Sequence, residues 1–419
     1  MELIPGYKQT EMGLIPNDWE LRKLEDISTI SRLAGAEYTS LWEETTNGEI
    51  IALRGFNIGR GRIIEKDFVR ISNELSLKLK RSRLCKGDVI YPCVGSIGNA
   101  VVINEDNKYH IQQNIARITP NSAAICSKYL ANFLMSSLGE MEVSRFNASS
   151  SQPNVLVGSL RQYRIPLPPT KAEQEAIAEV LSDADALIES LEQLIAKKRQ
   201  IKQGTMRELL TGKRRLMGFC EKWKVKRLDE LGRWTGGMTP SMGNPAYWQS
   251  GTVPWLSSGD VKSVRLTTTA LAISEYAIKE GTTTLVPAKS IIVVTRSGIL
   301  RRYLPVAMNI IPMAINQDIK ALLPNGNVQP DYLLHSLNYN GDRILSRCLK
   351  SGTTVESIEF RWLKDFTIPI PPLPEQTAIA EILDDMDADI SALEAKLAKA
   401  RHIKQGMMQE LLTGRIRLI

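Results

Sequence analysis

Two stretches of the chain carry apolar residues at a regular heptad spacing. The first stretch runs from Glu173 to Leu216 and the second from Glu375 to Leu418. Within each stretch the apolar positions alternate in steps of four and three, which is typical of a coiled-coil seam rather than of the stripe on a surface helix. We therefore predict two helices of about 36 residues, each about 54 Å long at 1.5 Å per residue. The predicted seam residues are Ile177, Leu181, Ile188, Leu191, Ile195, Ile379, Leu383, Met386, Ile390, Leu393 and Leu397.

The two stretches are copies of one sequence. Aligned without gaps, they are identical at 28 of 44 positions. A proline-rich lead-in precedes each copy, RIPLPPT before the first and TIPIPPLP before the second. Ahead of the lead-ins the two halves correspond only at landmarks, such as HIQQNIARITP and AINQDIKALLP. The chain is therefore an internal duplication in which two similar helices alternate with two dissimilar domains.

The duplication predicts an α+β fold with pseudo-twofold symmetry. We expect a variable domain of mixed helix and strand at 1–165, a helix at 166–212, a second variable domain at 213–367 and a second helix at 368–419. The first helix enters the second variable domain after almost no linker. A fully overlapped second helix must therefore run back along the first, which predicts an antiparallel coiled coil between the two domains. In the alternative interpretation, each helix packs only on its own domain.

The composition is that of an ordinary folded protein with a small positive charge. The 419 residues include 53 Lys and Arg against 46 Asp and Glu, for a net charge of +7, and 43% of them are apolar. No stretch approaches the ~18 apolar residues of a membrane span, and the N-terminus lacks the pattern of an export signal. Five scattered cysteines fit reduced thiols in the cytoplasm. The three histidines lack ligand spacing, so we predict no metal site.

Four motifs together give the chain a resemblance to a known family. They are GYKQTEMGLIPNDWE at the start, the two IPxPP lead-ins with their EQ and AIA, the two IKQGxMxELLTG ends, and GGMTPSMGNPAYW followed by VPWLSSGD in the second half. Over its whole length the sequence resembles the specificity subunit of Type I restriction-modification systems. The matching region of the first half, SRLAGAEYTSLWEETTNGEIIALRGFN, follows the last motif poorly.

The resemblance implies a non-catalytic, DNA-binding subunit. In that family each variable domain is a target recognition domain that reads one half of a bipartite site in double-stranded DNA. The helix pair is a spacer that docks two methyltransferase subunits and, through them, restriction subunits. S-adenosylmethionine and ATP then belong to the partner subunits, and this chain binds no cofactor. Because the two variable domains differ, we expect an asymmetric site, with half-sites about one turn, or ~10 base pairs, apart.

Cations for phosphates, and amide or hydroxyl groups for base edges, mark the candidate DNA contacts. Each has a competing interpretation as a solvated or strand-edge residue. In the first domain the candidates are Arg54, Asn57, Arg60, Arg62, Ser96, Asn99, Gln112, Gln113, Ser150 and Gln152. In the second domain they are Ser257, Lys262, Arg296, Ser297, Arg301, Arg302, Asn316, Gln317 and Thr353.

The sequence contains no complete catalytic motif. The segment from Asn244 to Tyr247 is one residue away from the NPPY motif of adenine methyltransferases, but Ala246 replaces the second proline and no glycine-rich cofactor loop accompanies it. We interpret the segment as a turn before Trp248. Two alternatives stay open: a coiled-coil DNA-binding regulator without modification partners, and a single-chain modification enzyme. Co-purification with an adenine methyltransferase would reject the first, and a methylation assay on the isolated chain tests the second.

Overall fold

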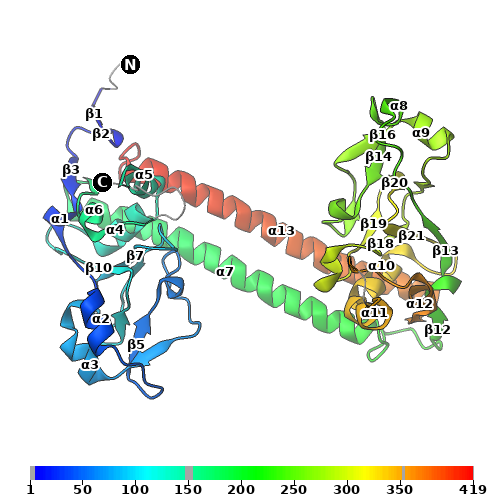
Figure 1. Cartoon of the computed structure of the whole chain (residues 1–419), viewed down its shortest axis with the longest axis horizontal. Helices are drawn as coiled ribbons and strands as arrows, with labels where there is room; N and C mark the ends of the chain where they lie inside the picture. Colours follow the sequence, from blue (N-terminus) through cyan, green and yellow to red (C-terminus); the bar gives the residue numbers. More distant parts are fainter. Residues whose placement is uncertain (1–4, 147–153, 352–353, 419) are drawn as a thin grey trace. The chain divides into compact units, whose positions relative to one another are not determined.

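The chain forms two compact units. The first comprises residues 1–192 together with 395–419, and the second comprises residues 193–394. Each unit contains one mixed domain and part of both long helices (Figure 1). Among the residues that the structure describes, no helix is long and apolar enough to cross a membrane. The computed structural model describes residues 5–146, 154–351 and 354–418.

The first unit is built on two small sheets. An antiparallel sheet has the strand order β4-β10-β7-β8, and a mixed sheet has the order β6-β5-β9, with β5 and β9 parallel. Two further strand pairs are β1-β2 and β11-β3. The strands are β1 (Tyr7–Thr10), β2 (Gly13–Pro16), β3 (Glu20–Lys23), β4 (Ser28–Ser31), β5 (Ile50–Leu53), β6 (Val69–Ile71), β7 (Val89–Pro92), β8 (Val101–Val102), β9 (Tyr109–Ile111), β10 (Ile115–Pro120) and β11 (Arg164–Leu167). The short helices are α1 (Leu24–Ile27), α2 (Gly35–Leu41), α3 (Asn73–Lys78), α4 (Ser127–Leu134), α5 (Ser137–Phe146) and α6 (Val157–Arg161), with 3-10 turns η1 (Gly55–Asn57) and η2 (Lys80–Ser82).

The second unit repeats this plan, but its two main sheets have five and four strands, against four and three in the first unit. Its sheets have the orders β13-β21-β18-β19-β15 and β16-β14-β20-β17, and β12 pairs with β22. The strands are β12 (Lys224–Arg227), β13 (Gly232–Gly236), β14 (Val253–Leu256), β15 (Arg265–Leu266), β16 (Leu271–Ile273), β17 (Leu285–Val286), β18 (Ile291–Val294), β19 (Val306–Asn309), β20 (Met313–Ile315), β21 (Ile319–Pro324) and β22 (Thr367–Ile370). The helices are α8 (Pro245–Trp248), α9 (Glu275–Lys279), α10 (Pro330–Tyr339), α11 (Gly341–Cys348) and α12 (Phe360–Asp365), with 3-10 turns η3 (Leu228–Glu230), η4 (Ser258–Asp260) and η5 (Gly298–Arg301).

Strand register shows that the two domains are equivalent in detail. Leu53 of β5 pairs in parallel with Ile111 of β9, and Leu256 of β14 pairs in parallel with Ile315 of β20. These pairings align HIQQNI with AINQDI, as the sequence landmarks predict. Strands β7 and β18 are buried along their whole length. A helix contacts each of these strands, α4 on β7 and α10 on β18, which explains why both strands are continuous apolar runs.

The long helices α7 (Lys171–Leu209) and α13 (Leu373–Leu412) are antiparallel within each unit. Thr170 begins α7 as a cap, with its Oγ1 accepting a hydrogen bond from the Glu173 N–H at 3.2 Å. The basic second half of each helix faces the acidic first half of the other. Partner numbers fall on one helix as they rise on the other, in the pairs Lys404–Asp185 and Arg401–Glu192 of the first unit and Lys202–Asp387 and Lys198–Asp389 of the second.

The predicted seam is the inward side of both helices. All eleven seam residues are buried or half-buried, whereas Leu187 and Leu194 beside them are 54% and 40% exposed. The helix ends also belong to the domain cores: Ile177 and Leu181 lie in the core of the first unit, and Leu383 lies in that of the second. The helices pair with each other as well as packing on the domains, so the alternative in which each helix packs only on its own domain is wrong.

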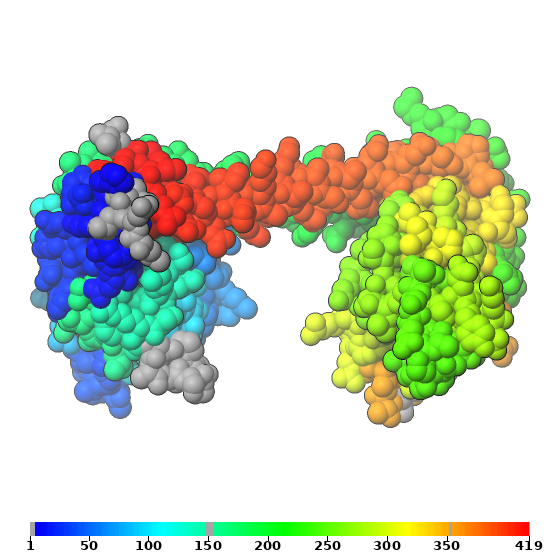
Figure 2. Space-filling view, turned by 90° about the horizontal axis from the view of Figure 1, so that it is seen from above, coloured from blue at the N-terminus to red at the C-terminus, as the bar shows by residue number. Residues whose placement is uncertain are grey.

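The C-terminal end of α13 closes on the N-terminal segment of the first unit. Figure 2 shows the two ends of the chain, red and blue, side by side. Arg417 lies between the carboxylates of Asp18 and Glu173, with Nη2–O distances of 3.0 and 2.9 Å. Hydrogen bonding to Arg417 lowers the pKa of Asp18. Gly414 has a φ of +69° and lies so close to Trp19 that a Cβ would approach the indole ring to 3.1 Å. A glycine is therefore required here both by conformation and by space.

The second unit has the same closure inside the continuous chain. Arg215 bonds both oxygens of Glu375, with its Nε at 2.7 Å and its Nη2 at 2.8 Å. Trp223 donates its Nε1–H to Glu375 at 2.9 Å, and Gly212, with a φ of +70°, lies under the Trp223 ring. The glutamate of each EQ motif thus receives the arginine that follows the LTG of the other helix.

Candidate nucleic-acid interface

A polar turn ends the parallel strand pair of the first unit. Gln112, Gln113 and Asn114 join β9 to β10, and the Gln112 N–H donates to the Leu53 carbonyl at 3.0 Å. Asn114 has a φ of +64°, in the left-handed region that asparagine tolerates better than most residues. Gln112 is buried, with its Nε2 3.3 Å from the Glu44 carboxylate, whereas Gln113 is half-buried. Gln113 is therefore more accessible than Gln112, and Asn114 is exposed.

The second unit carries the same turn with different side chains. Asn316, Gln317 and Asp318 join β20 to β21, and the Asn316 N–H donates to the Leu256 carbonyl at 3.0 Å. Asn316 is buried and bonds Asp318, whereas Gln317 is exposed. Gln317 accepts a hydrogen bond of 2.6 Å from the hydroxyl of Thr239. Sequence reasoning did not select Thr239, although it lies in the GGMTPS motif.

The hairpin loop of the first unit lies against this turn. The Cys93 N–H donates to the Asn114 carbonyl at 2.7 Å, at the start of the loop between β7 and β8. Ser96 and Asn99 in this loop are half-buried. Asn99 uses its amide to hold the next segment, donating to the Ile58 carbonyl at 2.9 Å. The loop is therefore tied at both sides, to the turn and to the segment that follows β5.

In the second unit the equivalent loop, between β18 and β19, is more basic. The Thr295 N–H donates to the Asp318 carbonyl at 2.8 Å, matching Cys93 and Asn114. Arg296 and Arg302 are exposed, and Ser297 caps the 3-10 turn η5. In both units a backbone hydrogen bond therefore joins the start of this loop to the polar turn.

The segment after β5 closes on itself through Asn57. This residue is fully buried; its Nδ2 donates to the carbonyls of Ile64 and Lys66 at 3.1 and 2.7 Å, and its Oδ1 accepts from the Arg54 N–H at 3.0 Å. The Arg54 guanidinium, half-buried, donates to the Asp67 carbonyl and lies over the Phe56 ring. Both side chains hold the loop in shape.

The second unit has the same closed loop with different residues. Asp260 accepts from the Ser257 N–H at 2.9 Å and from the Ser257 hydroxyl at 2.6 Å. Burial would raise the pKa of Asp260, but these hydrogen bonds outweigh it and the pKa is lowered. Arg54 and Asn57 therefore match Ser257 and Asp260 in structure, although the first half follows the VPWLSSGD motif poorly in sequence.

Several cationic candidates lie elsewhere. Arg60 donates to the Met135 carbonyl, and Arg62 lies 3.4 Å from Glu192 of α7, so both point toward helices rather than to the polar turn.

In the second unit, Arg301 pairs with Glu356, and its hydrogen bond lowers the pKa of that carboxyl. The acidic partner Glu356 was not selected from the sequence. Lys262 is exposed on the segment between η4 and β15. Ser150, Gln152 and Thr353 fall outside the described residues.

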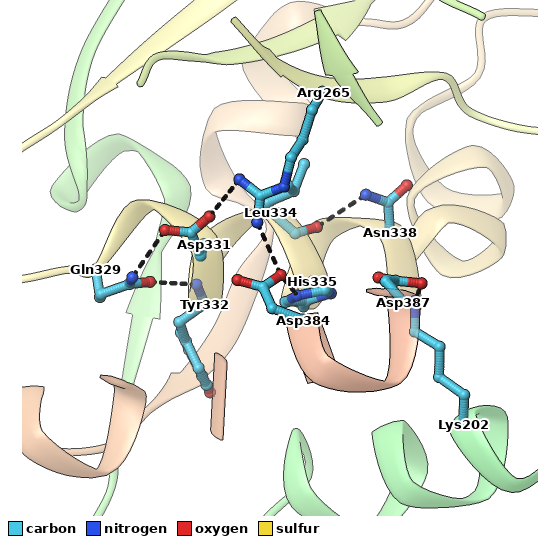
Figure 3. Close-up of polar contacts among 10 residues, drawn as sticks. All are labelled: Lys202, Arg265, Gln329, Asp331, Tyr332, Leu334, His335, Asn338, Asp384 and Asp387. Carbon is cyan, nitrogen blue, oxygen red and sulfur yellow. Dashed lines mark hydrogen bonds and ion pairs between the residues drawn. The ribbon is translucent and has the colours of Figure 1, made fainter. Parts of the chain in front are cut away.

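A cluster in the second unit has the side chains of a metal site. His335, Asp384 and Asp387 place ligand atoms within 4.8 Å of one another (Figure 3), and no other such group occurs in the part of the chain that the structure describes. Both carboxylates already pair with cations, Asp384 with Arg265 and Asp387 with Lys202. These two pairs neutralise the charge that would attract a metal ion.

The methyltransferase-like segment is a helix cap. Asn244 accepts a hydrogen bond from the Ala246 N–H at 3.1 Å and begins the short helix α8, with Pro245 at its first position. Trp248 packs edge-on against Trp255, with ring centroids 5.3 Å apart. The segment therefore has a structural role, as the sequence predicts, but it forms a one-turn helix that includes Trp248 rather than a turn before it.

The fold and the polar loops define an internally duplicated protein with two non-identical binding domains on a common helical scaffold. A family model described as "Type I restriction modification DNA specificity domain" matches twice, at residues 16–201 and 220–400. Together the two matches cover most of the chain, so the chain belongs to this family. It is a non-catalytic specificity subunit, and the comparisons support neither alternative function.

Individual relatives agree with the family. The specificity subunit of EcoR124I/EcoR124II from Escherichia coli is 36% identical over 193 residues, which are 45% of this chain and 47% of that relative. A protein of Methanocaldococcus jannaschii, provisionally named the MjaX specificity subunit, is 26% identical over 99% of this chain and 97% of its own length. The crystal structure of a Type I S subunit from M. genitalium has a TM-score of 0.59 at 14% identity, covering 98% of each chain. That structural likeness concerns the fold.

Proposed function

We propose that the two variable domains, 1–165 and 213–367, each read one half of an asymmetric, bipartite site in double-stranded DNA. One observation supports this above all: both units bring the polar turn and the hairpin loop together through equivalent backbone hydrogen bonds, while the side chains differ. A common backbone frame with different polar groups is what two readers of different sequences require. Gln113 of the first unit occupies the position that Gln317 occupies in the second. The loop of the first unit offers the half-buried Ser96 and Asn99, whereas the loop of the second unit offers the exposed Arg296 and Arg302.

Exposure separates base contacts from phosphate contacts in this proposal. Gln113 and Gln317 have amides suited to base edges, since an amide donates and accepts in one plane. Arg296, Arg302 and Lys262 are exposed cations suited to phosphates. Arg301 is neutralised by Glu356, and Asn57 is buried, so we assign neither to direct contact.

We further propose that the helix pair docks two methyltransferase subunits, which in turn recruit restriction subunits in the cytoplasm. The two closures support this, because Glu375 with Arg215 and Glu173 with Arg417 offer the same arrangement twice, once in each unit. Two identical partners need two equivalent surfaces. S-adenosylmethionine and ATP would be bound by the partners and not by this chain.

The direct test is to map methylated adenines in DNA exposed to the full chain with its methyltransferase partner. We expect methylation at one asymmetric sequence with two specified parts and an unspecified gap. Exchange of residues 213–367 for another recognition domain should change one part only. Methylation without sequence preference, or a change in both parts, would contradict the proposal.

A matched pair of variants tests the turn residues. We expect Gln317→Ala to lower the methylation rate about 10-fold and to relax the preference at one half-site, the effect of one lost base contact. Gln113→Ala should do the same at the other half-site. Arg302→Gln should weaken DNA binding at all sequences alike and reduce its salt dependence, as a lost phosphate contact does.

A further inference from the structure

An arginine links the edge strand β15 of the second variable domain to two helices. Arg265 of β15 lies between two carboxylates on different helices (Figure 3). Its Nη1 is 2.7 Å from Oδ1 of Asp331 on α10, and its Nη2 is 2.8 Å from Oδ1 of Asp384 on α13. His335 of α10 places its Nε2 2.8 Å from the same Asp384 oxygen. One guanidinium thus joins a strand of the domain to two helices.

The contacts are partly shielded from water. The side chain of His335 is 3% exposed and that of Asp331 is 19% exposed, whereas those of Arg265 and Asp384 are 40% and 35% exposed. Burial lowers the pKa of His335, although the hydrogen bond with Asp384 opposes this. One turn further along α13, Asp387 pairs with Lys202 of α7. A guanidinium that makes charge-assisted hydrogen bonds to two carboxylates at once holds geometry better than a single exposed ion pair.

The first unit folds without this cluster. The helix position of His335 is occupied there by Asn132, and that of Asp384 by Ser182. Each bonds its own helix: Asn132 donates to the Lys128 carbonyl at 3.0 Å, and Ser182 donates to the Ala178 carbonyl at 2.7 Å. The fold itself therefore does not require the cluster.

The arginine of the first unit makes a weaker contact. Arg62 follows Asn57 at the same distance along the chain as Arg265 follows Asp260. It also reaches a long helix, but by one contact of 3.4 Å to Glu192, and its side chain is 63% exposed. Arg265 of the second domain thus bonds two helices, whereas Arg62 of the first domain makes one exposed contact with one helix.

We propose that Arg265 is a positioning residue, which through Asp331 and Asp384 sets the orientation of the second recognition domain on α13 and thereby the gap length that the subunit accepts. This inference rests on the proposed function. Strand β15 has only two residues at the edge of its sheet, paired with β19 alone, so the backbone restrains it weakly. Lys262, a candidate phosphate contact, lies just before β15. Since one base-pair step is 3.4 Å, a small tilt of the domain is enough to change which gap fits.

A measurement without DNA tests the orientation directly. Spin labels at Thr268 and Glu381, both exposed in the second unit, report the distance between the domain and α13. Cys85, Cys126 and Cys220 are replaced by serine in all samples. We expect one narrow distance distribution in the otherwise unchanged protein and a distribution about twice as wide in Arg265→Gln and Asp384→Ser. Arg347→Gln, an exposed arginine on α11, is the matched control and should leave the width unchanged.

A second measurement tests the gap. Methylation rates of the full chain with its methyltransferase are compared on the mapped site and on sites with the gap shortened or lengthened by one base pair. We expect Arg265→Gln to reduce the preference for the native gap about 10-fold, to keep the half-site sequences, and to be partly rescued by Arg265→Lys. Thermal unfolding of each variant confirms that it is folded.

The outcomes separate the two proposals. An unchanged distance distribution in both variants would overturn the positioning role, as would a rate loss equal at all gaps. If the unchanged subunit shows no sequence-specific methylation, the proposed function fails, while the distance measurement still decides whether Arg265 positions the domain.

Discussion

At the scale of single residues, the EQ motif has a structural explanation. The Gln376 side chain is buried; its Oε1 accepts from the Gln329 N–H at 2.8 Å, and its Nε2 donates to the carbonyls of Asn327 and Pro371 at 3.2 and 2.8 Å. Gln174 makes the equivalent contacts in the first unit. One amide at each helix start thus satisfies three backbone groups of the loops around it.

We expect Gln376→Ala to lower the free energy of unfolding of the second unit by about 2–3 kcal/mol, because three backbone groups lose their hydrogen-bond partner. Urea unfolding followed by fluorescence measures this. Glu381→Ala, an exposed change on the same helix, should alter stability by less than about 0.5 kcal/mol. Equal effects of the two changes would show that the amide contacts contribute little.

His335 gives the second unit a dependence on pH. Its pKa in the folded chain is lowered from 6.5, chiefly by burial, so the unfolded chain binds a proton more readily. Stability is therefore fully present above pH 6.5 and falls as the pH is lowered through the folded pKa. The charged groups around the ring are Asp331, Asp384, Asp387, Arg265 and Lys202.

The corresponding prediction uses the residue of the first unit. We expect His335→Asn to reduce the fall in unfolding temperature between pH 7 and pH 5.5, measured by calorimetry, because asparagine does not titrate. His110, whose pKa burial also lowers, remains in both proteins and accounts for a residual fall. An identical fall in both proteins would show that His335 does not contribute.

At the scale of elements, charge decides how the helices pair. Each helix is acidic first and basic later, so an antiparallel pair places opposite charges together and a parallel pair would place like charges together. Lys404 is 13% exposed and bonds both oxygens of Asp185 at 2.6 Å. In the second unit Lys202 forms the corresponding ion pair with one oxygen of Asp387. The heptad pattern predicts the helices, and these pairs specify their direction.

We expect Asp185→Lys to destabilise the first unit by about 1–2 kcal/mol, because the new ammonium group then lies beside that of the largely buried Lys404. Adding Lys404→Asp should restore part of this loss. Asp183→Lys, on the exposed side of the same turn, is the control. Denaturant titration of the four proteins gives the coupling energy, and a double variant no better than the single one would contradict the pairing.

At the scale of the whole chain, the two closures differ in one respect. Arg215 and Trp223 are joined through the chain, whereas Arg417 holds an N-terminal segment to which it has no nearby covalent link. Tyr7 adds one contact, its hydroxyl donating to the Gly414 carbonyl at 3.2 Å. The first closure therefore depends more strongly on side-chain contacts, because no short loop holds its two sides together.

We expect Arg417→Gln to raise the rate of hydrogen exchange in residues 7–17 at neutral pH at least about 10-fold. A 10-fold rise corresponds to a loss of about 1.4 kcal/mol in the free energy that holds this segment against the end of α13. Arg215→Gln removes the equivalent arginine in the continuous chain and should raise exchange in residues 216–227 less. Similar increases in both would show that the covalent link makes no difference.

The sequence alone determined the duplication, the two long helices, their seam and the family, because heptad spacing and repeated motifs are local and periodic. It also predicted correctly that HIQQNIARITP and AINQDIKALLP are equivalent. Only the tertiary structure decided which polar residues are accessible. Asn57, Gln112 and Gln113 are all amides in polar segments, yet Asn57 is buried by closing its own loop and Gln112 is buried beside Glu44. The bridge from Arg265 to Asp331 and Asp384 likewise depends on contacts between residues far apart in the chain, which no local pattern contains.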